Sequence, residues 1–154
     1  MRWQQEKTVQ WKSEFNDNII RVLEGPQFHY FSKQSIKEFF LCKYKISNNS
    51  DRMGMRLEGH KIENIVSSNI ASEGIIKGSI QVTGDGNPII LMADHPTIGG
   101  YPKIATVISA DFAKVAQLSP GKKITFKKVT LLEAEKYFHK QQEILDKIYQ
   151  QITI

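Results

Sequence analysis

Residues 79–109 of the chain read SIQVTGDGNPIILMADHPTIGGYPKIATVIS. Two short apolar runs, at residues 79–82 and 89–93, flank a segment rich in Gly, Asp, Asn and Pro. This pattern predicts a β-hairpin, because these residue types favour tight turns between strands. A glycine pair at residues 99–100 separates the hairpin from a third β-branched run at residues 104–109. The stretch therefore predicts three short strands in succession.

The rest of the chain adds more short strands and a few helices. Strands are predicted at residues 18–23, 43–47, 53–57 and 124–129, and helical spacing occurs at residues 111–118. Capping-box patterns at residues 35–38 and 130–133 predict a short helix and a long C-terminal helix. The predicted fold is mainly β, a closed or nearly closed β-barrel with two or three peripheral helices. An α+β sandwich is the alternative. Residues 18–154 are expected to form this domain, after a polar lead-in of residues 1–17.

Composition excludes several classes of site. Of 154 residues only one, Cys42, is a cysteine, so neither an intramolecular disulfide nor a Cys/His zinc cluster is expected. No apolar run approaches the ~18 residues of a membrane helix, and the first residues do not resemble a signal peptide, so a cytoplasmic protein without a membrane partner is expected. Residues 102–128 carry six lysines and one aspartate. No nucleic-acid-binding signature accompanies them, so no nucleic-acid partner is predicted.

Arg52 and Arg56 flank Gly54 in the segment SDRMGMR. Residues four apart in a strand lie on one face, so the two guanidinium groups are predicted to clamp an anion. Alternatively, Arg52 pairs with Asp51 or Glu58 and only fixes the loop. Gly54 indicates either a close approach of a ligand or backbone, or a β-bulge.

The polar segment ADHPTIGGYPK, residues 93–103, is predicted to form the lip of a binding site. Its two glycines permit positive φ and close approach, and their N–H groups could form an anion-binding nest. Asp94 forms a polar pair with His95 in this interpretation, or else caps the turn through its own backbone. Gln81 would recognise a ligand amide, or would satisfy a neighbouring backbone group as a buried side chain.

The predicted substrate-binding set joins these two segments, and no catalytic or metal-binding residue is assigned. The set is Arg52, Gly54, Arg56, Gln81, Asp94, His95, Thr97, Gly99, Gly100, Tyr101 and Lys103. The chain has no phosphate-binding loop and no other nucleotide-binding motif, so it is not expected to bind a cofactor through motifs of its own.

Four segments together resemble the biotin-dependent carboxyltransferase family. They are RVLEGPQ (residues 21–27), NSDRMGMRLEG (49–59), SEGIIKGSIQVTGDGNPIILMADHPTIGGYPKIATVISADF (72–112) and AQLSPGKKITF (116–126). The family includes one of the subunits of bacterial 5-oxoprolinase, the allophanate-hydrolase-subunit-2 group and the carboxyltransferase domain of urea carboxylase. Two positions depart from its pattern: Thr83, where the family generally has Pro, and Pro96, where it usually has a polar residue.

The resemblance implies a cyclophilin-like β-barrel and a role in ATP-dependent hydrolysis of a small amide or lactam. The family's module is longer and has two related barrel halves, of which this chain resembles the second. The implied partners are therefore other subunits of a 5-oxoprolinase- or urea amidolyase-like complex, including a separate chain that supplies the first half. ATP, and biotin where the complex uses it, would act elsewhere, because the chain lacks a Met-Lys-Met biotinylation sequence.

Two alternatives to an enzyme component stay open. One is a non-catalytic regulatory module that binds a protein, of the type that antagonises a kinase inhibitor. The other is a truncated remnant that folds but does little. Alone, the half-length chain is expected to be inactive.

Overall fold

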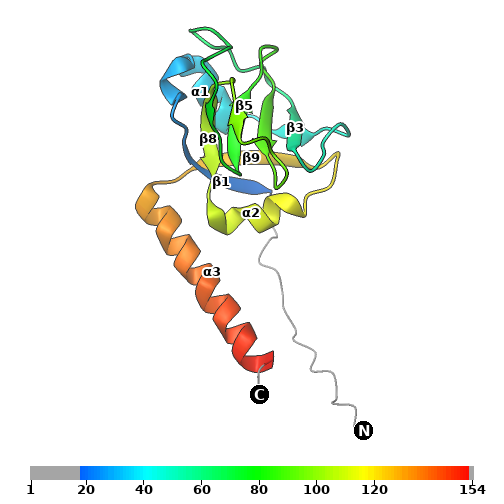
Figure 1. The fold of residues 1–154 in the computed structure, drawn as a ribbon, viewed down its shortest axis with the longest axis vertical. Helices are drawn as coiled ribbons and strands as arrows, with labels where there is room; N and C mark the ends of the chain where they lie inside the picture. The colour runs from blue at the N-terminus through cyan, green and yellow to red at the C-terminus, as the bar shows by residue number, and fades with distance from the viewer. Residues whose placement is uncertain (1–17, 153–154) are drawn as a thin grey trace.

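The computed structural model describes residues 18–152, which form a small β-barrel with peripheral helices (Figure 1). Helix α2 lies across one end of the barrel, and the long helix α3 projects away from it. In chain order the elements are β1 (Ile19–Glu24), the 3₁₀ helix η1 (Phe28–Tyr30), α1 (Lys33–Leu41), β2 (Tyr44–Ile46), β3 (Gly54–Glu58), β4 (Glu73–Gly74), β5 (Ser79–Val82), β6 (Pro88–Leu91), β7 (Ile98–Gly99), β8 (Lys103–Val107), α2 (Ser109–Ala116), β9 (Lys123–Lys128) and α3 (Leu131–Ile152).

Seven of the strands close into a barrel. Their order is β1-β8-β5-β6-β3-β2-β9, and β9 returns to pair with β1. The β1–β9 pair is parallel, with Ile20 opposite Phe126, whereas the other pairs in the barrel are antiparallel. The prediction of a mainly β, closed barrel with a long C-terminal helix is confirmed, and the sandwich alternative is wrong.

The barrel interior is filled by alternate residues of its strands. Ile20 and Val22 of β1 have no exposed surface, as expected when every second residue points inward. Phe39 of α1 stacks on Phe126 of β9, with ring centroids 4.5 Å apart. Full burial of a side chain such as Phe39 contributes roughly 1.5–3 kcal/mol. This contact fixes α1 against the barrel.

Strand β5 is buried on both faces, although only one face points into the barrel. Its outer face is covered by a flap, defined here as residues 70–75 and 97–100. The flap contains β4 and β7, which pair with each other, and two further backbone hydrogen bonds hold it together, from Ile70 N to Gly100 O at 2.8 Å and from Ile75 N to Thr97 O at 3.0 Å. Strand β5 therefore resembles a central strand of a layered fold.

A β-bulge interrupts the pairing of β5 with β8. Ile80 pairs with Ala105, but the next residue, Gln81, pairs with Lys103. Ile104 is thus the additional residue on β8, and bulges of this kind redirect neighbouring side chains. Lys103 and Gln81 consequently form a cross-strand pair beneath the flap.

Helices α2 and α3 are joined to the barrel through Asp111, which is fully buried. Its carboxylate accepts hydrogen bonds from the backbone N of Arg21 at 2.7 Å and from the Arg21 guanidinium. The guanidinium carbon lies 3.6 Å from the centre of the Tyr137 ring on α3. One arginine of β1 therefore ties down both helices.

The start of α3 follows the second predicted capping box. Thr130 Oγ1 accepts a hydrogen bond from Glu133 N at 3.3 Å, and Glu133 Oε2 accepts one from Thr130 N at 2.7 Å. Both partners thereby satisfy backbone donors at the helix N-terminus. In the described part of the chain, no helix combines the length and the hydropathy required to cross a membrane.

Candidate functional site

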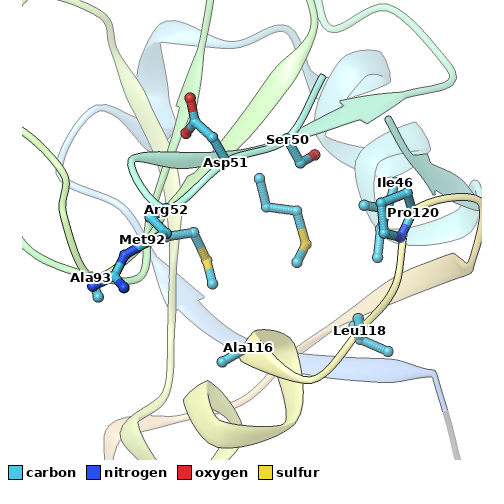
Figure 2. Close-up of a pocket in the computed structure, with 10 residues that line it drawn as sticks. Ile46, Ser50, Asp51, Arg52, Met92, Ala93, Ala116, Leu118 and Pro120 are labelled. Atoms are coloured by element: carbon cyan, nitrogen blue, oxygen red, sulfur yellow. The ribbon is translucent and has the colours of Figure 1, made fainter. Parts of the chain in front are cut away.

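A cavity of about 510 Å³ lies at the end of the barrel near α2 (Figure 2). Its walls come from the end of β2, the loop that leads into β3, the start of β3, the segment after β6, and the end of α2 with the segment that follows it. The wall is mainly apolar and includes the flexible side chains of Met55 and Met92, whereas Asp51 and Arg52 bring charge to it. The lining residues are Ile46, Ser50, Asp51, Arg52, Met55, Met92, Ala93, Ala116, Leu118 and Pro120.

Arg52 and Asp94 connect two loops beside this cavity. Arg52 Nε donates to Asp94 Oδ2 at 2.6 Å, and Nη2 donates to Oδ1 at 3.2 Å. The backbone N of Asp94 also donates to Arg52 O at 2.9 Å. The bidentate contact lowers the pKa of Asp94 and raises that of Arg52. Because the Arg52 side chain is 83% exposed, this pair is open to exchange with a solute.

The predicted clamp of Arg52 and Arg56 does not form. Asp51 Oδ1 accepts hydrogen bonds from the backbone N of Met53 at 2.8 Å and of Gly54 at 2.9 Å. This turn places Arg52 outside the strand, since β3 begins at Gly54. Arg56 is exposed on β3 and does not line the cavity. Arg52 pairs with neither of the acids considered as alternatives.

Gly54 has a close neighbour, but that neighbour belongs to the protein itself. A Cβ at this position would lie 2.8 Å from Cγ2 of Ile89 on β6. The pairing of β3 with β6 is regular through Gly54 and Leu91, so the bulge alternative is wrong. Gly54 therefore permits strand packing beside the cavity.

A second polar group, which includes the predicted residues Gln81 and Lys103, lies beneath the flap. Gln27, Gln81 and Lys103 are polar side chains that are at most 9% exposed. Gln27 Nε2 donates to Glu73 Oε1 on β4 at 2.7 Å, and the Lys103 ammonium forms an ion pair with the same oxygen. These contacts lower the pKa of Glu73, the one with Lys103 contributing most.

The Lys103 ammonium is isolated from solvent. Its Nζ is close to Glu73, but among the described residues no acceptor meets it in hydrogen-bond geometry. The contact with Glu73 is therefore a charge–charge contact whose angle does not suit a hydrogen bond. An ammonium has three N–H donors, and among the described residues Glu73 is the one carboxylate that contacts it.

Gly99 and Gly100 are not in the left-handed region, so the prediction of positive φ is wrong for both. The predicted close approach does occur, again with the chain itself. A Cβ on Gly99 would lie 2.7 Å from Gln81 Nε2, and one on Gly100 would lie 3.3 Å from Ile70 O. Because Gly99 and Gly100 have no side chains, the flap can pack closely against β5.

The other predicted residues of this segment have modest roles in the described structure. His95 Nδ1 lies 2.6 Å from Pro96 O, and no contact joins the ring to Asp94. Thr97 contributes its backbone carbonyl to the flap. The carbonyl of Tyr101 accepts a long hydrogen bond of 3.4 Å from Gln81 Nε2.

The predicted residues thus divide between two places. The segment after β6 begins beside the cavity, where Asp94 contacts Arg52, and ends beneath the flap at Lys103. Gln27 and Glu73 were not predicted, because nothing in the local pattern distinguishes them from ordinary turn residues. No group of three or more His, Cys, Asp or Glu side chains in residues 18–152 could hold a metal ion.

A family model described as the carboxyltransferase domain, subdomain A and B, matches residues 2–128. The chain belongs to this carboxyltransferase-domain family. The match ends just before α3, so it covers the whole described barrel.

Relatives of this carboxyltransferase-domain chain are longer than the chain itself. A 5-oxoprolinase subunit of Escherichia coli (strain K12) is 38% identical over 131 residues, which are 85% of this chain and 42% of the relative. The corresponding 5-oxoprolinase subunit of Haemophilus influenzae is 41% identical over 131 residues, which again are 85% of this chain and 42% of the relative. The crystal structure of the K. lactis urea amidolyase has a TM-score of 0.80 and 31% identity, covering 90% of this chain and 9% of that one. The chain therefore spans less than half the length of these relatives.

Proposed function

We propose that this chain is a component of an ATP-dependent complex that hydrolyses a small amide or lactam, and that it supplies the substrate-binding barrel. Its similarity to 5-oxoprolinase subunits and to urea amidolyase supports a complex of one of these types. The observation that carries the proposal is the cavity beside Arg52 and Asp94. Its volume of about 510 Å³ lies within the roughly 300–1,000 Å³ typical of small-ligand sites.

The Arg52–Asp94 pair matches the functional groups of such a substrate. The guanidinium, which now holds the Asp94 carboxylate bidentately, can hold a substrate carboxylate in the same way. Asp94, once released, can accept the N–H of an amide or lactam. 5-Oxoproline carries both a carboxylate and a lactam N–H. Its ring carbons would contact Met55 and Met92 in the apolar wall.

The chain's own contribution in this proposal is binding and orientation. Holding a small substrate in one pose beside another subunit lowers the entropic barrier of the reaction. ATP, and biotin where it is used, would act on other subunits. No residue of this chain is assigned as a catalytic acid, base or nucleophile.

Exposed apolar side chains support a partner chain. Ile98 in the flap and Ile76 next to it are each more than half exposed, and so are Ile65 and Val66. Such groups are typical of surfaces that another protein covers. In the proposed complex, the partner includes a chain equivalent to the part of the relatives that this chain does not span. The same surface favours the second candidate function, a regulatory module that acts by protein contact alone.

The experiment is 5-oxoproline-dependent and urea-dependent ATP hydrolysis by the complex reconstituted with its other subunits. Arg52→Ala is expected to raise the KM for substrate by about tenfold or more, because a charge-assisted bidentate contact is lost. Met92→Trp is expected to fill the cavity and abolish turnover. Arg56→Ala is the matched control, since it removes an exposed arginine of β3 that does not line the cavity.

If the wild-type complex and the complexes with Arg52→Ala, Met92→Trp or Arg56→Ala are equally active, the cavity is not the substrate-binding site. If the complex assembles but hydrolyses ATP with neither substrate, the regulatory candidate is favoured. That candidate predicts that partner binding, measured by calorimetry, is weakened by Ile98→Asp and unaffected by Arg52→Ala.

A further inference from the structure

The polar groups beneath the flap form a compact arrangement that the proposed substrate cavity does not use. Gln27, Gln81 and Lys103 come from three separate segments, and all three are buried on the outer side of the barrel. An ammonium as inaccessible as that of Lys103, 3% exposed, is costly unless a counter-charge and acceptors surround it. The only carboxylate that meets it among the described residues is Glu73.

We propose that the polar side chains beneath the flap, Gln27, Gln81 and Lys103, form a second ligand site, specific for a small carboxylate, and that the side chain of Glu73 takes the place of the ligand when none is bound. On this view Glu73 is an internal stand-in for the ligand. The site lies outside the barrel and shares no residue with the lining of the barrel-end cavity. It therefore does not depend on the function proposed for that cavity.

The donors of the site converge on a single oxygen. Gln27 Nε2 donates to Glu73 Oε1 at 2.7 Å, and the Lys103 ammonium contacts the same atom. A ligand carboxylate placed there would meet one neutral donor and one cation, which is a strong combination for an anion.

Gln27 is held in position for this role. Its side-chain Oε1 accepts a hydrogen bond from Lys103 N at 3.1 Å, and its backbone N donates to Lys103 O at 3.3 Å. These bonds fix the side chain before any ligand arrives. A donor that is already oriented loses little entropy when it binds.

Gln81 provides a second amide. The bulge at Ile104 places Gln81 opposite Lys103, and directly opposed residues have Cβ atoms about 4.5–5.5 Å apart. The Nε2 of Gln81 makes only a long bond of 3.4 Å to Tyr101 O. It can therefore turn toward the second oxygen of a ligand carboxylate.

Glu73 is suited to be displaced. It lies on a strand of two residues, and its side chain is 43% exposed although its partner is buried. The carboxylate can move into water without leaving the flap.

The test uses the purified chain with acetate and formate as probes, exchanged for chloride at constant ionic strength. Glu73→Ala is expected to gain thermal stability with acetate, because a ligand that binds only the folded state raises its melting temperature. The gain should exceed that of the wild type and of Glu58→Ala. Glu58 is the matched control, since it is a half-exposed carboxylate outside the flap that contacts Lys45 at 3.8 Å and accepts a hydrogen bond from Ser47 Oγ at 2.6 Å. The double variant Glu73→Ala, Lys103→Met should show no acetate-dependent gain.

A measurement on the wild type needs no variant to fold. Saturating acetate should displace Glu73 and increase hydrogen exchange at the flap amides of Ile70 and Ile75, while amides of β1 stay unchanged. The proposal is overturned if acetate stabilises Glu73→Ala no more than Glu58→Ala, or if the double variant keeps the gain. It is also overturned if flap exchange in the wild type does not respond, because Glu73 is then a fixed structural partner. None of these results bears on ATP hydrolysis through the barrel-end cavity.

Discussion

Lys103 faces Gln81 because β8 contains one residue more than β5 at that point. Without the bulge, Ile104 would be opposite Gln81, and the pairing of Ile80 with Ala105 would continue in register. The bulge thus places a charged residue on a face that the flap then covers. The ion pair that results is asymmetric, because Lys103 is buried and Glu73 is half exposed.

This asymmetry predicts unequal effects of removing the two partners. Glu73→Ala leaves a buried ammonium without a counter-charge and should reduce the free energy of unfolding by about 1–3 kcal/mol. Lys103→Met replaces the ammonium by an apolar group of similar length, and Glu73 returns to water, so a change of under about 1 kcal/mol is expected. Urea denaturation of both variants provides the comparison. A larger loss for Lys103→Met would contradict the described burial.

Close packing of the flap predicts a steric effect at Gly99. A Cβ there would lie 2.7 Å from Gln81 Nε2 and 3.1 Å from Ile75 Cδ1, so Gly99→Ala should destabilise the protein by about 1–2 kcal/mol. Shortening the neighbour in Gly99→Ala, Gln81→Ser should recover part of this loss. Gly74→Ala in the paired strand is the control, because its Cβ would meet nothing within 4 Å. Equal melting temperatures for the two alanine variants would show that the flap does not press on β5.

The ion pair beneath the flap also predicts a dependence on pH. The contacts with Lys103 and Gln27 hold the pKa of Glu73 below its ordinary value of 4.5. The folded state therefore binds this proton less readily than the unfolded state, and the stabilisation is complete above pH 4.5. It is lost as the pH falls below that value toward the folded-state pKa.

Glu73→Gln should accordingly lose less stability than the wild type between about pH 6 and pH 3. Melting temperatures measured across that range provide the check. Glu58→Gln, which replaces a carboxylate outside the flap, is the control. If the melting temperature of Glu73→Gln changes with pH as steeply as that of the wild type, the carboxylate of Glu73 is not engaged in solution.

The regular parts of this fold could be predicted because their signals are local. The hairpin of β5 and β6 follows from a turn segment whose Gly86 adopts φ +79°, and the capping box at Thr130 starts α3 as expected. The start of α1 was predicted one turn too late. Ser32 caps that helix by accepting from Ser35 N, and this pair lacks the glutamate that made the later pattern more prominent.

The arrangement of the candidate sites could not be predicted, because it depends on distant residues. The turn at Asp51 places Arg52 outside β3, where it pairs with Asp94, 42 positions away in the sequence. Gln27 and Glu73 are separated by 46 positions. Neither contact leaves a periodic pattern or a motif in the sequence. The sequence therefore predicts one binding site formed by both polar segments, and not the two separate places that the structure shows.

The junction of β1, α2 and α3 provides a last prediction. The Asp111 carboxylate is fully buried and accepts bonds from both the backbone and the guanidinium of Arg21. Asp111→Ala leaves Arg21 half-buried and unpaired, so a loss of about 3–5 kcal/mol is expected. Tyr137→Leu keeps that ion pair and removes only the ring beneath the guanidinium, for which about 0.5–2 kcal/mol is expected.

Limited proteolysis should distinguish the two variants further. In Asp111→Ala, the Arg21 side chain loses the carboxylate that orients it beneath Tyr137, so cleavage within α3 should become faster than in Tyr137→Leu. Phe138→Leu, which alters the next residue of α3 without touching Arg21, should be cleaved at the wild-type rate. If α3 is cleaved equally fast in all of these proteins, the helix is held to the barrel by contacts other than Arg21, and the role assigned to that arginine fails.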